Sequence, residues 1–212
     1  MLAELLRRYT MSTGKARSVY RRVCQPSGAE YADFLRRHGG FHAIGEGCYI
    51  SPSANITDPA FVHIGNNVRI SECSIFGHDG AVNMVNRAFG LHLDSVGKVE
   101  IRDNVFIAHG CIVQPGVVIG PNAIICAGSV VNRDVPEGSI VAGVPAKPVS
   151  TVAMYVQLLK ARNERYPWKK LVESRKGDYD PAMEVELKRL RLDFFFPSKP
   201  GAASGPKSGD GR

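Results

Sequence analysis

The sequence lacks the long apolar runs that mark membrane proteins and secretory signals. No uninterrupted apolar stretch approaches the roughly 18 to 20 residues that span a bilayer. The first ten residues, MLAELLRRYT, offer too short an apolar stretch for a signal peptide and no small-residue cleavage site. With 44% hydrophobic and 22% charged residues among 212, the composition is that of an ordinary globular protein. We expect one cytoplasmic domain with small terminal additions and no membrane span.

Paired cysteines are also missing. The five cysteines are scattered and none belongs to a CxxC pair. A disulfide scaffold or a zinc knuckle needs paired and regularly spaced cysteines, so both are excluded, and a reducing compartment fits.

Positive charge is scarce in the middle of the chain, although the formal net charge is +7. Residues 1–38 carry a net +5 and residues 39–149 a net −3, while residues 150–196 and 197–212 carry +3 and +2. A nucleic-acid groove needs a basic stripe interleaved with aromatic residues. The large middle region has none, and we expect no nucleic-acid partner.

What the sequence does contain is a repeat of six residues. From Ile101 an aliphatic residue recurs at every sixth position, at Ile101, Ile107, Val113, Ile119, Ile125 and Val131. The same period occurs earlier at Ile44, Ile50, Ile56 and Val62, and it resumes two residues out of phase at Ile64, Ile70 and Phe76.

This period suits stacked, bent strands. Along a helix, successive sixth residues would lie about 240° apart and form no stripe. A β-sandwich would show strict alternation with turns about every 8 to 12 residues. Short extended segments bent at each hexad bring every sixth residue to one inner wall, where stacked coils bury a continuous aliphatic column. The sequence therefore predicts a mainly-β parallel β-helix over residues 41–149.

The remaining segments are predicted from where the repeat stops. Residues 77–98 break the period and hold two of the six histidines, so we expect a protruding loop of the kind that carries chemistry. Apolar spacing predicts helices over 29–38, 149–165 and 181–195. Residues 1–40 are thus expected to form a helical cap and residues 150–196 the C-terminal helices. The Gly-, Pro-, Ser- and Lys-rich residues 197–212 are expected to be disordered.

Several segments carry a family resemblance. They are VHIGNNVRI (62–70), the Gly77–His78 pair, VEIRDNVFIAHGCIVQPGVVIGPNAIICAGSVVNRDVP (99–136) and AGVPAKPV (142–149). Together they resemble the hexapeptide-repeat acyltransferases, in the sugar and xenobiotic O-acetyltransferase branch. The resemblance implies a left-handed β-helix, a homotrimer, acetyl-CoA in a cleft between neighbouring coils, and a loop histidine acting as base. YPW (166–168) and RLDFFF (191–196) also resemble members tied to surface-polysaccharide or lipopolysaccharide acetylation.

The long loop holds the candidate catalytic pair. Acetyl transfer from a thioester to a hydroxyl needs a base for the alcohol proton and hydrogen-bond donors for the oxyanion. Neutral histidine suits the first role, since its reference pKa is about 6.5. His78 lies at a flexible turn beside Asp79. We expect His78 to be the general base and Asp79 to orient the imidazole or stabilise its cation. The alternative for His78 is a solvated loop histidine.

The resemblance also implies a set of cofactor-binding residues, namely His109, Ala127, Asn132, Arg133 and Lys147. Phosphates require fixed cations and backbone donors, and Arg133 and Lys147 are the candidate cations, with ordinary solvated charges as the alternative. His109 either lines the pantetheine channel or packs at a corner. Cys111 and Cys126 suggest a covalent acyl-enzyme, but Cys111 occupies a small position of its hexad and is expected to pack as a buried apolar residue.

Loop residues are the candidate acceptor contacts, namely Asn83, Asn86, Arg87 and His92, although His92 equally fits a surface position. A zinc enzyme of the same fold, the gamma-class carbonic anhydrase, uses three histidines, two of them in an H-x4-H arrangement. Here Gln114, a poor zinc ligand, stands at that distance from His109. We therefore expect no metal.

The sequence thus predicts an acetyl-CoA-dependent O-acetyltransferase that acts by direct attack on a hydroxyl of a sugar or glycan precursor. Two alternatives remain open. One is an amino-sugar N-acetyltransferase, since the same base and cofactor serve an amine, and acceptor profiling separates the two. The other is a non-catalytic β-helix scaffold, which would not bind coenzyme A.

Overall fold

The computed structural model describes residues 1–177 and 179–197, and the chain divides into two units, Met1–Tyr155 and Val156–Arg212. The tail predicted for residues 197–212 lies, from residue 198 onward, outside the described residues. Among the helices of the described residues, none is long and apolar enough to cross a membrane.

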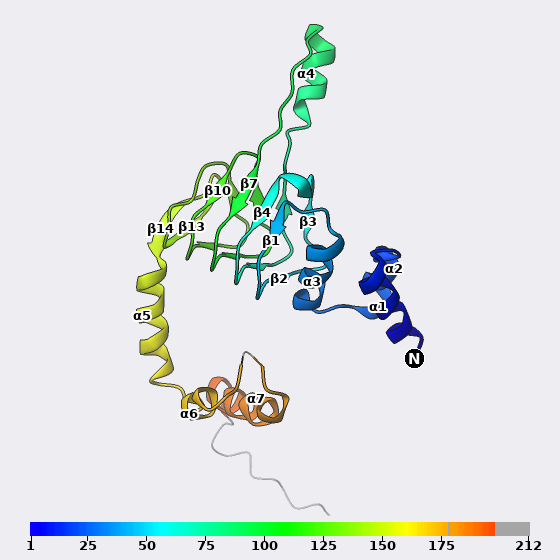
Figure 1. The fold of residues 1–212 in the computed structure, drawn as a ribbon. Coiled ribbons are helices and arrows are strands. Elements are labelled where there is room, and N and C mark those ends of the chain that lie inside the picture. The colour runs from blue at the N-terminus through cyan, green and yellow to red at the C-terminus, as the bar shows by residue number, and fades with distance from the viewer. Residues whose placement is uncertain (178, 198–212) are drawn as a thin grey trace, which may run out of the picture. The chain divides into compact units, whose positions relative to one another are not determined.

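Three sheets form the body of the first unit, and the chain visits them in rotation (Figure 1). Sheet A contains β1 (Ala43–Ile44), β4 (Val62–Ile64), β7 (Val99–Ile101) and β10 (Val118–Ile119). Sheet B contains β2 (Tyr49–Ile50), β5 (Arg69–Ile70), β8 (Phe106–Ile107), β11 (Ile124–Ile125), β13 (Ser139–Ala142) and β14 (Lys147–Thr151). Sheet C contains β3 (Asn55–Ile56), β6 (Ser74–Ile75), β9 (Ile112–Val113) and β12 (Val130–Val131). All pairings except β13 with β14 are parallel. The fold is the predicted left-handed parallel β-helix with flanking helices.

The six-residue repeat supplies the interior of the coil. Ile107 stacks on Ile125, and Val113 stacks on Val131, in the parallel register. The fully buried members of this column are Ile50, Ile64, Ile70, Ile75, Ile101, Ile107, Val113, Ile119 and Ile125. Burying one side chain of this size contributes about 1.5 to 3 kcal/mol. The aliphatic column is therefore the main source of stability in the first unit.

Asparagines hold the corner where each coil passes from sheet A to sheet B. Asn67, Asn104 and Asn122 have positive φ angles of 52°, 58° and 56°, a conformation that asparagine tolerates better than most residues. The Asn67 amide donates to Asn104 Oδ1 at 2.9 Å, and the Asn104 amide donates to Asn122 Oδ1 at 3.0 Å. On the first coil Gly47, with φ 67°, takes the same position.

The phase slip in the repeat has a local cause. Ile64 stacks on Ile44, so the additional residues between Ile56 and Ile64 enlarge one corner of the coil. This corner contains the 3-10 turn η1 (Pro59–Phe61), entered through Asp58 at φ 49°. The assignment of Phe76 to the column was wrong, because the step after Ile70 is one residue shorter and Ile75 faces the interior, paired with Val113.

Three helices precede the coil, α1 (Leu2–Thr13), α2 (Arg17–Cys24) and α3 (Gly28–His38). Ser27 caps α3 by accepting a hydrogen bond from the Glu30 backbone N–H at 3.2 Å. Arg36 of α3 donates to the carbonyl oxygens of Ile44, at 3.0 Å, and of Gly45. These contacts tie α3 to the first strand, whose sheet edge would otherwise be open to other chains.

The long loop carries a helix of its own, α4 (Ala81–Phe89), which has no buried residue and protrudes from the coil (Figure 1). After the last coil, α5 (Val152–Asn163) begins later than the predicted residue 149. The reason is that β14 pairs antiparallel with β13 before the helix starts, and Thr151 Oγ1 then accepts from the Met154 N–H at 3.2 Å.

The second unit contains α6 (Lys169–Glu173) and α7 (Pro181–Phe195), the latter with the predicted bounds. Trp168 is 6% exposed, and its ring lies 4.6 Å from the Tyr166 ring and 5.4 Å from the Phe194 ring. Trp168 and, in α7, Leu187 are thus buried in this unit, and the half-exposed Phe194 packs against Trp168.

Candidate active site

His78 and several other candidate residues lie at one corner of the coil, where the chain passes from sheet C to sheet A. We call it the C–A corner. It consists of residues 57–61, 76–98, 114–117 and 132–134. Stacking of the strands before it sets these segments one above another. The backbone N–H groups of Thr57, Phe76 and Gln114 each donate to the next coil, at 3.0, 3.0 and 2.9 Å. Segments that are distant in sequence are therefore neighbours here.

His78 and Asp58 form a hydrogen bond at this corner, between His78 Nδ1 and Asp58 Oδ2. The hydrogen bond from His78 lowers the pKa of the Asp58 carboxyl from its usual value of 3.8, so this group is a carboxylate that only accepts. His78 Nδ1 therefore carries the proton, and Nε2 is left as the basic nitrogen. The two side chains are 47% and 31% exposed, which leaves the imidazole accessible to a ligand.

Backbone pairing at the base of the loop fixes His78. The Gly97 N–H donates to the Gly77 carbonyl oxygen at 2.9 Å, and the Asp79 N–H donates to that of Ser95 at 2.9 Å. Between them His78 and Val96 form an antiparallel bridge. The two ends of the loop thus make a short neck, and the catalytic candidate lies on this ordered neck rather than on the tip.

Asp79 lies elsewhere than the sequence suggested. Its carboxylate accepts from the Ala81 N–H at 2.9 Å, at the start of α4, whereas Asp58 contacts the imidazole. Sequence reasoning missed Asp58, which is 20 positions away from His78. The phase slip in the repeat could have indicated Asp58, because Asp58 belongs to the enlarged corner that causes the slip.

A pocket of about 410 Å³ opens beside the imidazole, lined by Thr57, Phe76, His78, Asp79, Gly80, Gln114 and Pro115. This volume lies within the usual range of about 300 to 1,000 Å³ for small-molecule sites. Its wall combines an aromatic ring, a side-chain amide and an imidazole. The pocket can therefore hold a polar organic molecule against a base.

The expected cofactor residues border the outer face of sheet C. Asn132 and Arg133 follow β12 and lie at the C–A corner, one coil beyond Gln114. His109 and Ala127 lie on adjacent coils at the other edge of the sheet, where the Gly128 N–H donates to the His109 carbonyl oxygen at 2.9 Å. The structure thus brings Asn132 and Arg133 to the corner of His78 and keeps His109 and Ala127 apart from it.

Lys147 begins β14 above the last coil. The N–H of its neighbour Ala146 donates to the Val130 carbonyl oxygen at 2.8 Å, which sets this segment at the end of sheet C. Between the two corners the outer face of the sheet presents Ser74, Ile112 and Val130, and Ile112 is 37% exposed. A ligand lying along this face would meet the exposed Ile112, with Lys147 near the end of the sheet.

The expected acceptor residues lie on the protruding part of the loop and none of them lines the His78 pocket. Asn83 and Arg87 are exposed on α4, and His92 is exposed on the returning segment. The Asn86 amide is engaged within the loop, because it donates to the Leu93 carbonyl oxygen and accepts from the Leu93 N–H, both at 2.9 Å. Asn86 therefore holds α4 to the returning segment.

Two buried cysteines are poor nucleophile candidates, whereas Cys126 is partly exposed. Cys111 is 1% exposed, as its hexad position predicted, and burial raises the pKa of its thiol. Burial, with a smaller contribution from Cys111, raises the pKa of Cys73 to about 12. A thiol of such high pKa has little thiolate at neutral pH. Among the described residues, no three His, Cys, Asp or Glu side chains are grouped so that they could hold a metal ion.

Comparison with known proteins gives a family for the repeat. Residues 98–133 match the bacterial transferase hexapeptide (six repeats) family. A provisionally assigned acetyltransferase of Saccharomyces cerevisiae is 39% identical over 120 residues, 56% of this chain and 60% of that protein. The galactoside O-acetyltransferase of Escherichia coli is 34% identical over 112 residues, 51% of this chain and 53% of that enzyme.

The chain thus spans little more than half the length of the curated relatives it matches. A solved hexapeptide-repeat acetyltransferase of Vibrio cholerae covers 69% of this chain, and 92% of its own chain, at 20% identity with a TM-score of 0.49. The resemblance to hexapeptide-repeat acyltransferases expected from the sequence motifs is confirmed.

Proposed function

We propose that this chain, which carries bacterial transferase hexapeptide repeats, is an acetyl-CoA-dependent O-acetyltransferase acting on a hydroxyl of a sugar or glycan precursor. The observation that carries the proposal is the His78–Asp58 pair. It leaves a basic imidazole nitrogen open to a pocket of about 410 Å³, at the corner that Asn132 and Arg133 share.

His78 acts as the general base. Its Nε2 takes the proton of the acceptor hydroxyl while the hydroxyl oxygen attacks the thioester carbonyl carbon. The C–O bond forms first, the C–S bond then breaks, and His78 returns the proton to the departing thiolate. The products are the acetyl ester and free coenzyme A. No residue of the chain becomes acylated, which agrees with the burial of Cys73 and Cys111.

Asp58 and Gln114 support this proton transfer in different ways. The Asp58 carboxylate fixes the tautomer of His78 and stabilises the imidazolium that forms during attack. The Gln114 amide lines the same pocket and can donate a hydrogen bond to the carbonyl oxygen as it becomes negative. Asp79 contributes by accepting a hydrogen bond from the Ala81 N–H at the start of α4, and hence by holding the loop.

The outer face of sheet C suits acetyl-CoA. The exposed Ile112 offers an apolar surface to the pantetheine arm, and His109, Ala127 and Asn132 border that surface. Arg133 and Lys147 are both exposed and supply cations for the phosphates. Since one end of this face adjoins the His78 corner, a thioester lying along it would present its carbonyl carbon to the acceptor.

We also propose the wider setting. A homotrimer would cover apolar side chains of the protruding loop that the single chain exposes, namely Met84, Phe89, Leu91, Leu93 and Val96. The five free cysteines suit a reducing cytoplasm. A role in surface-polysaccharide or lipopolysaccharide biosynthesis rests on the resemblance of the C-terminal segments.

The test is release of the coenzyme A thiol from acetyl-CoA in the presence of hydroxylated and aminated sugars. We expect His78→Ala to lower kcat by about 10² to 10⁴-fold with hydroxyl acceptors, while coenzyme A binding and circular dichroism are unchanged. An unaltered rate would remove His78 from its role. Transfer to amines alone would identify an N-acetyltransferase, and absence of coenzyme A binding would identify a scaffold.

A further inference from the structure

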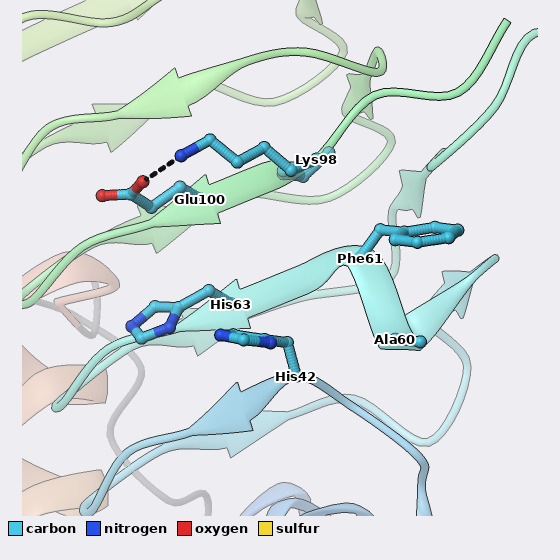
Figure 2. Close-up of a pocket in the computed structure, with 7 residues that line it drawn as sticks. His42, Ala60, Phe61, His63, Lys98 and Glu100 are labelled. Carbon is cyan, nitrogen blue, oxygen red and sulfur yellow. Dashed lines mark hydrogen bonds and ion pairs between the residues drawn. The ribbon is translucent and has the colours of Figure 1, made fainter.

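A second pocket, of about 420 Å³, lies on the outer face of sheet A, lined by His42, Ala60, Phe61, His63, Lys98, Val99 and Glu100. Figure 2 shows His63 and His42 side by side, the Lys98 side chain extended toward Glu100, and Phe61 at one edge. His63 is in register with Glu100 on the neighbouring strand. We call this cavity the sheet A pocket, and none of its residues has a role in the proton transfer.

The sheet A pocket combines flat rings with a fixed carboxylate. Phe61 is 47% exposed, and the His42 and His63 rings lie 5.9 Å apart between centroids. Glu100 is held from both sides, by Lys98 Nζ on Oε2 at 3.1 Å and by Arg102 Nε on Oε1 at 3.0 Å. These two hydrogen bonds lower the pKa of the Glu100 carboxyl, so it accepts hydrogen bonds as a carboxylate.

This chemistry suits a sugar ring. The C–H face of a pyranose is apolar and lies well against an aromatic side chain such as Phe61, while its hydroxyls need donors and acceptors at the edge. Each Glu100 oxygen keeps a lone pair for a sugar hydroxyl, and the imidazoles donate or accept. A small anion would meet the Glu100 charge between the two cations, which makes a neutral polyol the better ligand.

The sheet A pocket adjoins the candidate active site through one short segment. Thr57 lines the His78 pocket, while Ala60 and Phe61 line the sheet A pocket. Three residues of chain span at most about 11 Å, so the two pockets lie close together. The loop neck borders both pockets, because His78 on its outgoing end lines one and Lys98, directly after its returning end, lines the other.

We propose that the sheet A pocket binds a second sugar unit of the acceptor, so that the preferred acceptor is an oligosaccharide or glycan whose neighbouring unit is acetylated at His78. This proposal rests on the proposed function, because it assigns the acceptor to the same corner. Binding energy from the remote unit would orient the reacting hydroxyl toward the base.

The experiment compares acceptors of different length. Acetyl transfer is measured with glucose, maltose and maltotriose and with galactose and lactose, and binding of the same sugars without acetyl-CoA is followed by saturation-transfer NMR. The variants are Phe61→Ala, which removes the stacking surface, and Glu100→Gln, which keeps the shape and removes the charge. Phe106→Ala is the matched control, since Phe106 is an exposed phenylalanine (38%) on sheet B.

We expect the wild type to favour at least one of the longer sugars over its monosaccharide. Phe61→Ala should raise the KM for that sugar about fivefold to tenfold, with the KM for acetyl-CoA and for the monosaccharide unchanged. Glu100→Gln should act in the same direction, and Phe106→Ala should leave all values as in the wild type.

Three results would overturn the proposal. They are equal KM values for short and long sugars, an equal effect of Phe61→Ala on both, and no binding of any of these oligosaccharides. Acetyl transfer that requires His78 but does not depend on sugar length would refute the role proposed for the sheet A pocket and leave the proposed function intact. Binding that depends on Phe61 without any acetyl transfer would instead refute the proposed function and leave the pocket a sugar site.

Discussion

Gly77 lies against Asp58 so closely that position 77 has no room for a side chain. A Cβ at Gly77 would be 2.7 Å from the Asp58 Cβ and 3.2 Å from its Oδ2, distances that real Cβ atoms scarcely reach. The Gly77 N–H also donates to Thr57 Oγ1 at 3.3 Å. The glycine before His78 is therefore required by the carboxylate that contacts this histidine.

Gly77→Ala tests this relationship. The added methyl group should displace Asp58 from His78 and lower kcat about tenfold to a hundredfold, because misplacement of a catalytic group by about 1 Å can cost that much. Gly80→Ala adds a methyl group to the wall of the same pocket but away from Asp58, because a Cβ at Gly80 meets no atom within 4 Å. It should therefore change the acceptor KM rather than kcat, and an equal loss of kcat in the two variants would contradict the relationship between Gly77 and Asp58.

Asp58→Asn separates charge from shape. The amide oxygen can still accept from His78 Nδ1, but it cannot stabilise the imidazolium, and we expect kcat to fall about a hundredfold. Asp79→Asn should change kcat less than about threefold, because the Asp79 carboxylate accepts from the Ala81 N–H and does not contact the imidazole. The reverse order of effects would restore Asp79 as the orienting residue.

The pH dependence of the same pair follows from the lowered pKa of Asp58. A carboxyl whose pKa is lowered in the folded protein keeps its charge as the pH falls, until the pH passes that lowered pKa. Asp58 should thus be charged throughout the neutral range, and the loss of kcat in Asp58→Asn should be fully present at about pH 7 to 8. Equal kcat values of the wild type and Asp58→Asn in that range would contradict the assignment.

Lys147→Ala addresses the cofactor face. Loss of the cation should raise the apparent KM for acetyl-CoA about fivefold to twentyfold, with the acceptor KM unchanged. Lys15→Ala, an exposed lysine on the N-terminal segment, is the control. A change confined to the acceptor KM would refute the proposed role of Lys147.

Gly47→Asn is expected to stabilise the chain. Gly47 has φ 67°, and a Cβ there would meet no atom closer than 3.9 Å. Asparagine tolerates a positive φ better than most residues, as Asn67, Asn104 and Asn122 show. At position 47 it would extend their ladder to the first coil, and the added hydrogen bond, worth about 0.5 to 1.5 kcal/mol, should outweigh the strain of this φ. Thermal unfolding should show a higher Tm.

The control for this stabilisation is Gly45→Asn. A Cβ at Gly45 would lie 2.6 Å from the Gly65 carbonyl carbon, so this variant should melt below the wild type. If Gly47→Asn also lowered the Tm, the ladder would not be the stabilising feature that its hydrogen bonds indicate.

Burial of Cys73 predicts alkaline destabilisation. Its thiol pKa rises from 9.0 to about 12 in the folded chain, so the unfolded chain loses this proton first and folding is disfavoured as the pH rises through that interval. The contribution is about 1.4 kcal/mol per pH unit. Urea unfolding at several pH values should show a shallower decline for Cys73→Ala, and equal slopes would contradict the raised pKa.

The repeat made most of the first unit predictable. The spacing of Ile101, Ile107 and Val113 is read directly from the sequence, and few folds can bury every sixth residue of a chain. The bounds of α7 could also be predicted from the sequence, because Pro181 and the cap at Asp180 are local signals. The helix in the long loop was missed although its apolar residues recur at helical spacing. The segment was assigned as a loop only because it breaks the six-residue period.

The sequence by itself determined the coil, the aliphatic column and the identity of His78 as the candidate base, because local spacing and short motifs carry that information. Only the tertiary structure decided which carboxylate contacts the imidazole. Asp79 is adjacent in sequence but points to α4, whereas Asp58, on the preceding coil, reaches His78. The physical reason is that stacking in parallel register places a residue of one coil beside a residue of the next coil. The enlarged corner between Ile56 and Ile64 places Asp58 in that position beside His78.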